Sequence, residues 1–187
     1  MYQLFVNIPN CNGCRDCELA CAAKQTETSD KLQRRPDKKL SHPTIKITKH
    51  SPTPGSLVSI KSFESKDSTL FFPFLCFHCT EAPCLDACIS GAMKQDTQTG
   101  QVYVDQNQCV GCWSCIMVCP FGIIQPNTNA KAFAFKCDGC RDLAIPACVK
   151  SCLPKALVFQ ESSHFVNKKR RAQAQQLIKP YALHHRR

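Results

Sequence analysis

Short apolar stretches recur along the chain and predict strands rather than long buried helices. Three segments, ISGAMKQD at 89–96, PFGIIQP at 120–126 and LPKALVFQ at 153–160, each combine turn residues with a short apolar run. This pattern is typical of a turn followed by a strand. Between residues 93 and 104, turn-forming residues at 97–100 precede an alternating VYV segment, which predicts a β-hairpin.

The region before these segments is different in character. A charged run, KLQRRPDKK at 31–39, is followed by HPTIKITKH at 42–50 and GSLVSIKSF at 55–63, both with strand-like alternation. We expect a flexible turn and then a β-hairpin. The richest apolar run, LFFPFLCF at 70–77, contains a proline and falls far short of the roughly 18 residues that a membrane-spanning helix needs.

The end of the chain is strongly basic. Seven Lys or Arg and no acidic residue follow residue 167. Residues 168–178 suit a short helix that stops near Pro180. We expect a basic C-terminal tail over 161–187 that acts as a docking arm, the alternative being a solvated terminal segment.

Composition adds one outlier to this picture, because 16 of the 187 residues are cysteine. A disulfide framework would account for an even number of thiols in a secreted protein. The N-terminal MYQLFVNIPNC, however, has no basic n-region, apolar core, small-residue cleavage site or twin arginine. The chain is therefore expected in the reducing cytoplasm, with free thiols.

The cysteines sort into four quartets with none left over. The first and third follow C-x2-C-x2-C-x3-C, and Pro120 completes the bacterial ferredoxin pattern in the third. The second and fourth widen the middle gap to four and seven residues. We call the first and third quartets the compact motifs and the second and fourth the widened motifs. In chain order the quartets are Cys11, Cys14, Cys17, Cys21; Cys76, Cys79, Cys84, Cys88; Cys109, Cys112, Cys115, Cys119; and Cys137, Cys140, Cys148, Cys152.

Motifs of this spacing hold [4Fe-4S] clusters in pairs. Three cysteines of a motif grip one cube, and the fourth, which opens a helical turn, ligates a different one. Since two quartets are central and two are distant, the economical pairing is inner with inner and outer with outer. The predicted fold is α+β, with an outer module (1–30 with 126–160), an inner module (72–125) and a β-hairpin insertion (31–71) in one domain over 1–160.

Two other classes of protein stay open at this point. A zinc-binding interaction module would also use four thiolates, although zinc sites usually take them from two well-separated C-x2-C pairs. A redox-sensing nucleic-acid binder would use the formal net charge of +10. Four oxidised clusters would contribute about −8 and bring that charge near +2, so nucleic acid is not expected as a partner.

Motifs for substrate chemistry are missing from the sequence. There is no Ser, His and acid constellation, no G-x-x-x-x-G-K phosphate loop and no G-x-G-x-x-G fingerprint. The chain is therefore expected to be non-catalytic by itself.

The quartets resemble the four-cluster ferredoxin-like subunits of anaerobic oxidoreductases such as dimethyl sulfoxide reductase, formate dehydrogenase and formate hydrogenlyase. The segments CFHCTEAPCLDAC and CVGCWSCIMVCPFG are most similar to the iron-sulfur subunit associated with carbon monoxide dehydrogenase. This resemblance implies four [4Fe-4S] clusters with the following ligands: Cys11, Cys14, Cys17, Cys152; Cys137, Cys140, Cys148, Cys21; Cys76, Cys79, Cys84, Cys119; and Cys109, Cys112, Cys115, Cys88.

The resemblance also implies a row of clusters that relays electrons between two partners. One partner is a catalytic subunit with nickel, molybdenum, tungsten or flavin, and the other is a second electron carrier. A free diffusible polyferredoxin and self-association into a filament are alternatives. Ala22, Ile89 and Leu153 replace the ferredoxin proline after three quartets, which puts only loop geometry in doubt.

Three side chains beside the cysteines invite a role. His78 is expected to pack or to hydrogen-bond rather than to ligate iron, since its quartet is complete. Trp113 is expected to pack in the core, with shielding of a cluster as the alternative. Lys136 is expected to be solvated by default, with electrostatic stabilisation of a reduced cluster as the alternative.

Overall fold

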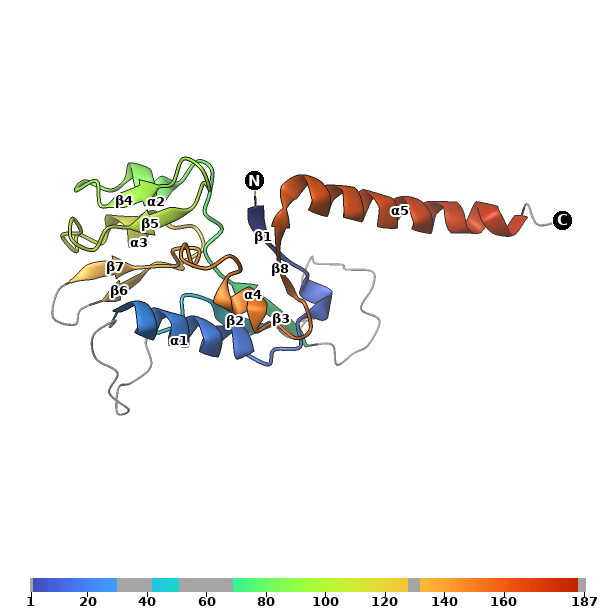
Figure 1. The fold of residues 1–187 in the computed structure, drawn as a ribbon, viewed down its shortest axis with the longest axis horizontal. Helices are drawn as coiled ribbons and strands as arrows, with labels where there is room; N and C mark the ends of the chain where they lie inside the picture. Colours follow the sequence, from blue (N-terminus) through green and yellow to red (C-terminus); the bar gives the residue numbers. More distant parts are fainter. Residues whose placement is uncertain (1, 30–41, 51–68, 128–131, 185–187) are drawn as a thin grey trace.

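The computed structural model describes residues 2–29, 42–50, 69–127 and 132–184. Small two-stranded sheets and short helices form a body, from which one long helix extends (Figure 1). The predicted α+β class is confirmed, with strands in four antiparallel pairs.

The two ends of the cysteine-bearing region are joined by strand pairing. β1 (Tyr2–Val6) pairs antiparallel with β8 (Leu157–Glu161), so that Val6 lies opposite Leu157. The chain then passes through the 3-10 helix η1 (Ile8–Asn10) into α1 (Asp16–Ser29). α1 packs against α4 (Ala147–Lys150), which precedes β8 by only a few residues. The first motif and the last motif are therefore neighbours in space.

The central part of the chain forms its own group of elements. α2 (Pro83–Asp86) packs on α3 (Ser114–Val118). β4 (Met93–Gln95) pairs with β5 (Val102–Val104), which confirms the hairpin expected between residues 93 and 104. The segment after Cys119 leads into a strand, as expected, but this strand, β6 (Gln125–Asn127), begins only after the apolar pair Ile123 and Ile124; it pairs with β7 (Phe133–Phe135).

The expected insertion is described only in part. Its first strand is present as β2 (Lys46–His50), whereas the second expected strand, at 55–63, lies outside the described residues. β2 pairs instead with β3 (Leu70–Phe74), the apolar run around Pro73 that was not expected to form a strand. Pro73 is tolerated there because a two-stranded sheet offers the missing N–H an unpaired edge.

Cysteine side chains are part of both hydrophobic cores. The first core unites buried residues from both ends of the chain and from in or beside β2 and β3: Cys17, Cys21, Ile45, Ile47, Leu75 and Leu157. The second core gathers residues of the central elements and of β7: Ala82, Met93, Val102, Cys115, Ile124 and Ala134. Although residue 134 falls on the outer side of the expected module boundary, it packs in the central core.

Residues 162–184 of the basic tail form one long helix, α5 (Ser162–His184). It starts six residues earlier than expected and passes Pro180, so both expected ends are wrong. The early start has a tertiary cause: Phe165 stacks on Phe5 of β1 at a centroid distance of 4.0 Å, and the Ser162 hydroxyl donates to Gln3. The helix continues past Pro180 although a proline cannot donate the backbone hydrogen bond of the helix. No helix in the described part of the chain is long and apolar enough to span a membrane.

Candidate metal centre

Each cysteine motif opens with a loop that needs a left-handed backbone at its third position. Gly13, Gly111 and Gly139 occupy this position with φ between +69° and +76°, and His78 occupies it with φ of +47°. The turn brings two successive cysteines onto the same side of the loop. The sequence shows the three glycines clearly, whereas His78 conceals its place in the same pattern.

The third cysteine of every motif is the second residue of a helix. Cys17 lies in α1, Cys84 in α2, Cys115 in α3 and Cys148 in α4. The fourth cysteine follows one helical turn later, because four residues make about one turn. The expectation that the fourth cysteine opens the turn is therefore wrong: the third opens it, and the fourth lies at its far end and faces another cavity.

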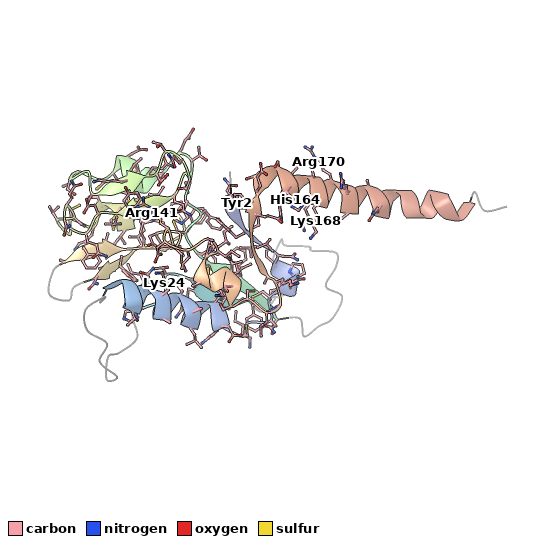
Figure 2. All side chains as sticks on the ribbon, viewed as in Figure 1. Tyr2, Lys24, Arg141, His164, Lys168 and Arg170 are labelled. Atoms are coloured by element: carbon pink, nitrogen blue, oxygen red, sulfur yellow. The ribbon has the colours of Figure 1, made fainter. Side chains whose placement is uncertain are left out.

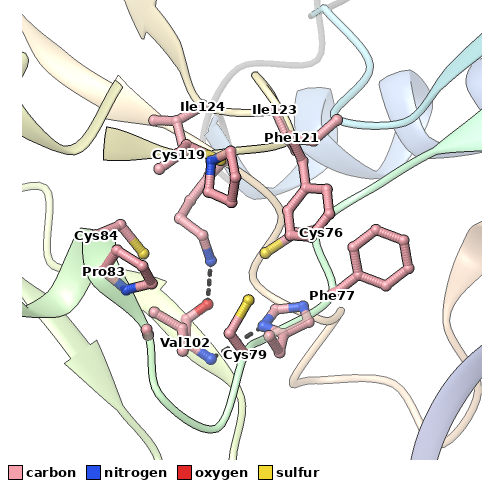
Figure 3. A pocket seen from close by; sticks show the side chains of 14 residues that line it. Cys76, Phe77, Cys79, Pro83, Cys84, Val102, Cys119, Phe121, Ile123 and Ile124 are labelled. Carbon is pink, nitrogen blue, oxygen red and sulfur yellow. Dashed lines mark hydrogen bonds between the residues drawn. The ribbon is translucent and has the colours of Figure 1, made fainter. Parts of the chain in front are cut away.

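Four cavities are lined by these thiols, and each has three cysteines of one motif and one of another in its wall. The cavity with Cys21, Cys137, Cys140 and Cys148 is also lined by Cys76 of the second motif. Atom-free space in them ranges from about 300 to about 790 Å³, open mouths included. Thiols that surround such a space suit a cluster. We name the cavities by their cysteines: site A (Cys11, Cys14, Cys17, Cys152), site B (Cys21, Cys137, Cys140, Cys148), site C (Cys76, Cys79, Cys84, Cys119; Figure 3) and site D (Cys88, Cys109, Cys112, Cys115).

Burial makes several of these thiols poor anions by themselves. It raises the pKa of Cys17 and Cys148 to about 12 and that of Cys115 to about 11. It also raises the pKa of Cys137 well above its ordinary value. A thiol must lose its proton to bind iron, so the loaded metal has to supply the free energy of ionisation.

Electrostatic repulsion acts between thiolates of the same site and between thiolates of adjacent sites. Within sites, Cys152 raises the pKa of Cys17 and Cys119 raises that of Cys84, after burial as the main cause. Between sites, three pairs interact. These pairs are Cys17 with Cys148, Cys76 with Cys137, and Cys84 with Cys115. The sites therefore follow one another in the order A, B, C, D.

Backbone N–H groups donate hydrogen bonds to several sulfur atoms, and a threonine hydroxyl shares a hydrogen bond with one of them. The N–H of Met93 lies 3.2 Å from Cys88 Sγ, and that of Leu157 lies 3.4 Å from Cys152 Sγ. Buried Thr44 places both its N–H and its hydroxyl within 3.4 Å of Cys21 Sγ. Such bonds stabilise thiolates and influence cluster potentials. Sequence reasoning missed Thr44, because nothing near it in the sequence suggests contact with a cysteine 23 positions away.

The three side chains beside the cysteines have distinct fates. His78 accepts a hydrogen bond from the Val102 N–H at 3.0 Å, as a hydrogen-bonding residue should, and burial followed by the Lys136 charge lowers its pKa to about 3. Trp113 is half-buried and lines site D, which suits a shield as well as a packing residue. The expectation of a solvated Lys136 is wrong, since it is only 6% exposed and lines site C.

Comparisons with known proteins agree with this arrangement of thiols. Residues 68–162 match the family model of the 4Fe-4S dicluster domain. An iron-sulfur protein of Rhodospirillum rubrum is 30% identical, over 95% of this chain and 92% of its own length. The B subunit of the anaerobic dimethyl sulfoxide reductase of Escherichia coli (strain K12) is 32% identical, over 84% of this chain and 72% of its own length.

A shorter match is stronger in identity. The protein NrfC of Escherichia coli (strain K12) is 44% identical over 96 residues, which are 48% of this chain and 42% of NrfC. The cofactors expected of these thiols are therefore [4Fe-4S] clusters. The chain belongs to the ferredoxin-like family of 4Fe-4S dicluster electron-transfer proteins.

Proposed function

We propose that this chain is the electron-transfer subunit of an oxidoreductase complex and carries four [4Fe-4S] clusters, one at each of sites A, B, C and D. The observation that supports it most strongly is the composition of the four cavities, since each has three thiols of one motif and one of another. Cys76, which also lines site B, completes the set at site C. The ligands of each cluster are then the four cysteines that define its site.

The nested modules follow from the same ligand sets. Sites A and B form the outer module, 1–30 with 126–160, and sites C and D form the inner module, 72–125. Contacts of α1 with α4 and of α2 with α3 support this division. The insertion over 31–71 contributes β2 and Thr44 to the outer module, and the basic tail covers 161–187.

The protein relays electrons along the row from one end to the other. A [4Fe-4S] cluster accepts and releases one electron at a time. The chain's own part is to hold the clusters in sequence and to exclude water from the middle of the row. The thiolate repulsions between Cys17 and Cys148, and between Cys84 and Cys115, support this order.

The two ends of the row have surfaces suited to redox partners. At site A, Cys14 is exposed and the neighbouring Leu153 is 83% exposed. At site D, Cys112 is exposed, as are Ile89 (79%) and Met117 (84%). Exposed apolar side chains that gather at one place mark contact surfaces. A catalytic subunit docks at one end and a second electron carrier at the other.

The catalytic partner is an anaerobic oxidoreductase subunit of the nickel, molybdenum, tungsten or flavin type, of which carbon monoxide dehydrogenase is one case. The complex works in the cytoplasm, and the chain itself performs no substrate chemistry. α5 leaves the body as a basic arm with Lys168 and Arg170 (Figure 2), which suits an acidic surface of a partner or of a second copy in a filament.

Metal and sulfide analysis of anaerobically purified protein tests the proposal. We expect about 16 iron and 16 sulfide per chain. Four zinc ions without sulfide would establish a zinc-binding module instead. Mass spectrometry of the proteins that copurify in constant ratio then identifies the catalytic partner, whereas purification without any partner would establish a diffusible polyferredoxin. Salt-dependent binding to DNA or RNA would contradict the proposal.

A further inference from the structure

Lys136 is a buried cation at the wall of site C. It follows β7 directly and precedes Cys137, a thiol of site B. Its side chain does not follow Cys137 into site B but lines the neighbouring cavity, together with Cys76, Cys84 and the other site C thiols. One residue thus stands at the boundary between the two middle sites.

The ammonium group of Lys136 has carbonyl oxygens as its partners. It donates to Cys137 O at 2.7 Å and to Val102 O (Figure 3). Within the described part of the chain, Lys24, Lys94 and Arg141 form ion pairs with carboxylates, whereas Lys136 forms no ion pair. A buried charge without a counterion destabilises the folded protein. A cluster in site C supplies the missing negative charge.

The position of this cation is firmly held. Its partner Val102 is 1% exposed and belongs to the central core. The N–H of Val102 donates in turn to the neutral ring of His78, so the backbone of this one residue is held at both its N–H and its carbonyl oxygen (Figure 3). A charge that is held in place does not need to reorganise when the neighbouring cluster is reduced, so its electrostatic effect on that cluster is retained.

Lys136 also acts on the thiols around it. Burial raises the pKa of Cys84, and the charge of Lys136 opposes that rise. The same opposition is present at Cys137. The positive charge therefore favours negative charge on both walls of the boundary.

We propose that the positive charge of Lys136 raises the reduction potential of the cluster in site C relative to the potentials of the neighbouring clusters. This inference rests on the proposed function. Reduction adds one electron, without forming or breaking a bond, and changes the charge of the cluster from about −2 to about −3. A fixed cation lining the cavity stabilises the more negative state more strongly, so electrons reside longer in the middle of the row.

The test is a reductive titration of the loaded protein, followed by electron paramagnetic resonance, with Lys136→Gln as the main variant. Glutamine removes the charge and keeps a hydrogen-bond donor for the carbonyl oxygens. At fixed ambient potential, we expect the ratio of reduced to oxidised cluster in site C to fall about tenfold or more, which is about 59 mV for one electron. Cys84→Ser identifies the signal of site C by altering it.

Two controls separate charge from structure. Lys136→Arg keeps the cation, and its ratio should stay within about threefold of the wild type. Lys94→Gln removes a lysine of β4 that pairs with Asp105 at 3.1 Å and is 38% exposed, and its ratio should stay within the same range. If Lys136→Gln fails to retain iron, Lys136→Met is judged by the same criterion.

Full iron content with an unmoved site C potential in Lys136→Gln would overturn this inference and leave the proposed function intact. Wild-type protein without iron would overturn the proposed function first. A shift of equal size in Lys94→Gln would show a general effect of net charge and would also overturn the inference.

Discussion

The compact motifs and the widened motifs leave their second cysteines in different surroundings. In the compact motifs, which contribute three thiols each to sites A and D, Cys14 and Cys112 are exposed. In the widened motifs, which do the same for sites C and B, Cys79 is half-buried and Cys140 is buried. The short loop is therefore found at the two ends of the row and the long loop in its middle.

The additional residues of the widened motifs explain this difference. In the second motif, Ala82 belongs to the gap, is 4% exposed and lines site C. In the fourth, Pro146 belongs to the gap, is buried and lines site B, while Arg141 lies on the surface, 3.3 Å from Asp96. The widened gaps thus add packing around the middle sites, whereas the compact gaps leave the end sites open. Four predictions test how far this contrast extends.

Cluster removal should have the largest effect and should abolish the contrast. Because cysteines are part of both hydrophobic cores, we expect the iron-free chain to be largely unfolded, in its compact and widened motifs alike. Circular dichroism after complete anaerobic chelation measures this. A native-like spectrum of the iron-free chain would contradict the prediction, and regain of the original spectrum on adding iron and sulfide is the control.

Single ligand substitutions should separate the two kinds of motif. Cys84→Ser and Cys112→Ser should each lose up to about 4 of about 16 irons. We expect Cys84→Ser to lower the melting temperature more, because Cys84 is half-buried against the central core while Cys112 is exposed. Equal losses of stability at equal iron content would show that burial of the site does not matter.

Alanine at the loop glycines should show which motif tolerates a side chain. At Gly13, a Cβ would lie 2.5 Å from the Phe71 ring, and at Gly139 it would lie 2.5 Å from the end of the flexible Gln101 side chain. Gly91 also has positive φ but has free space around it. We expect destabilisation of about 3–4 kcal/mol for Gly13→Ala and about 1–2 kcal/mol for the other two.

Thermal unfolding of the loaded proteins gives these values. Gly91→Ala is the matched control, since it carries the backbone strain without a clash. A loss at Gly13→Ala no larger than that at Gly91→Ala would exclude a role for the Phe71 contact.

The smallest effect is expected at the surface of the fourth motif. Arg141→Gln should lower the melting temperature slightly and leave the iron content unchanged, because the pair with Asp96 is exposed to solvent and salt. Hydrogen bonds from the backbone N–H groups of Thr99 and Gln98 lower the pKa of Asp96. The stability that ionised Asp96 contributes to the fold is therefore lost as the pH falls through that lowered pKa. A loss of iron in Arg141→Gln would show instead that the widened loop holds site B.

The sequence predicts best what depends on near neighbours along the chain. The spacing of the quartets, the turn after β4 and the strand after Cys119 all follow from local pattern. Loop glycines such as Gly111 are visible for the same reason. These features require only that a few consecutive residues adopt one conformation.

Features that depend on distant contacts could not be predicted in this way. Lys136 is buried because Val102, 34 positions earlier, offers it a carbonyl oxygen. Thr44 contacts Cys21 across part of the insertion, and α5 starts early because Phe5 packs under Phe165. In each case a residue far along the chain decides the outcome, and no local pattern records it.

The pairing of β1 with β8 has a consequence for synthesis. On the ligand sets proposed here, sites C and D have all their thiols once residue 119 has been made, whereas site A waits for Cys152 although its first three cysteines are among the first 17 residues. A chain leaving the ribosome therefore holds Cys11, Cys14 and Cys17 as unmatched thiols until its last motif emerges. The first metal site to be translated is among the last that can be completed.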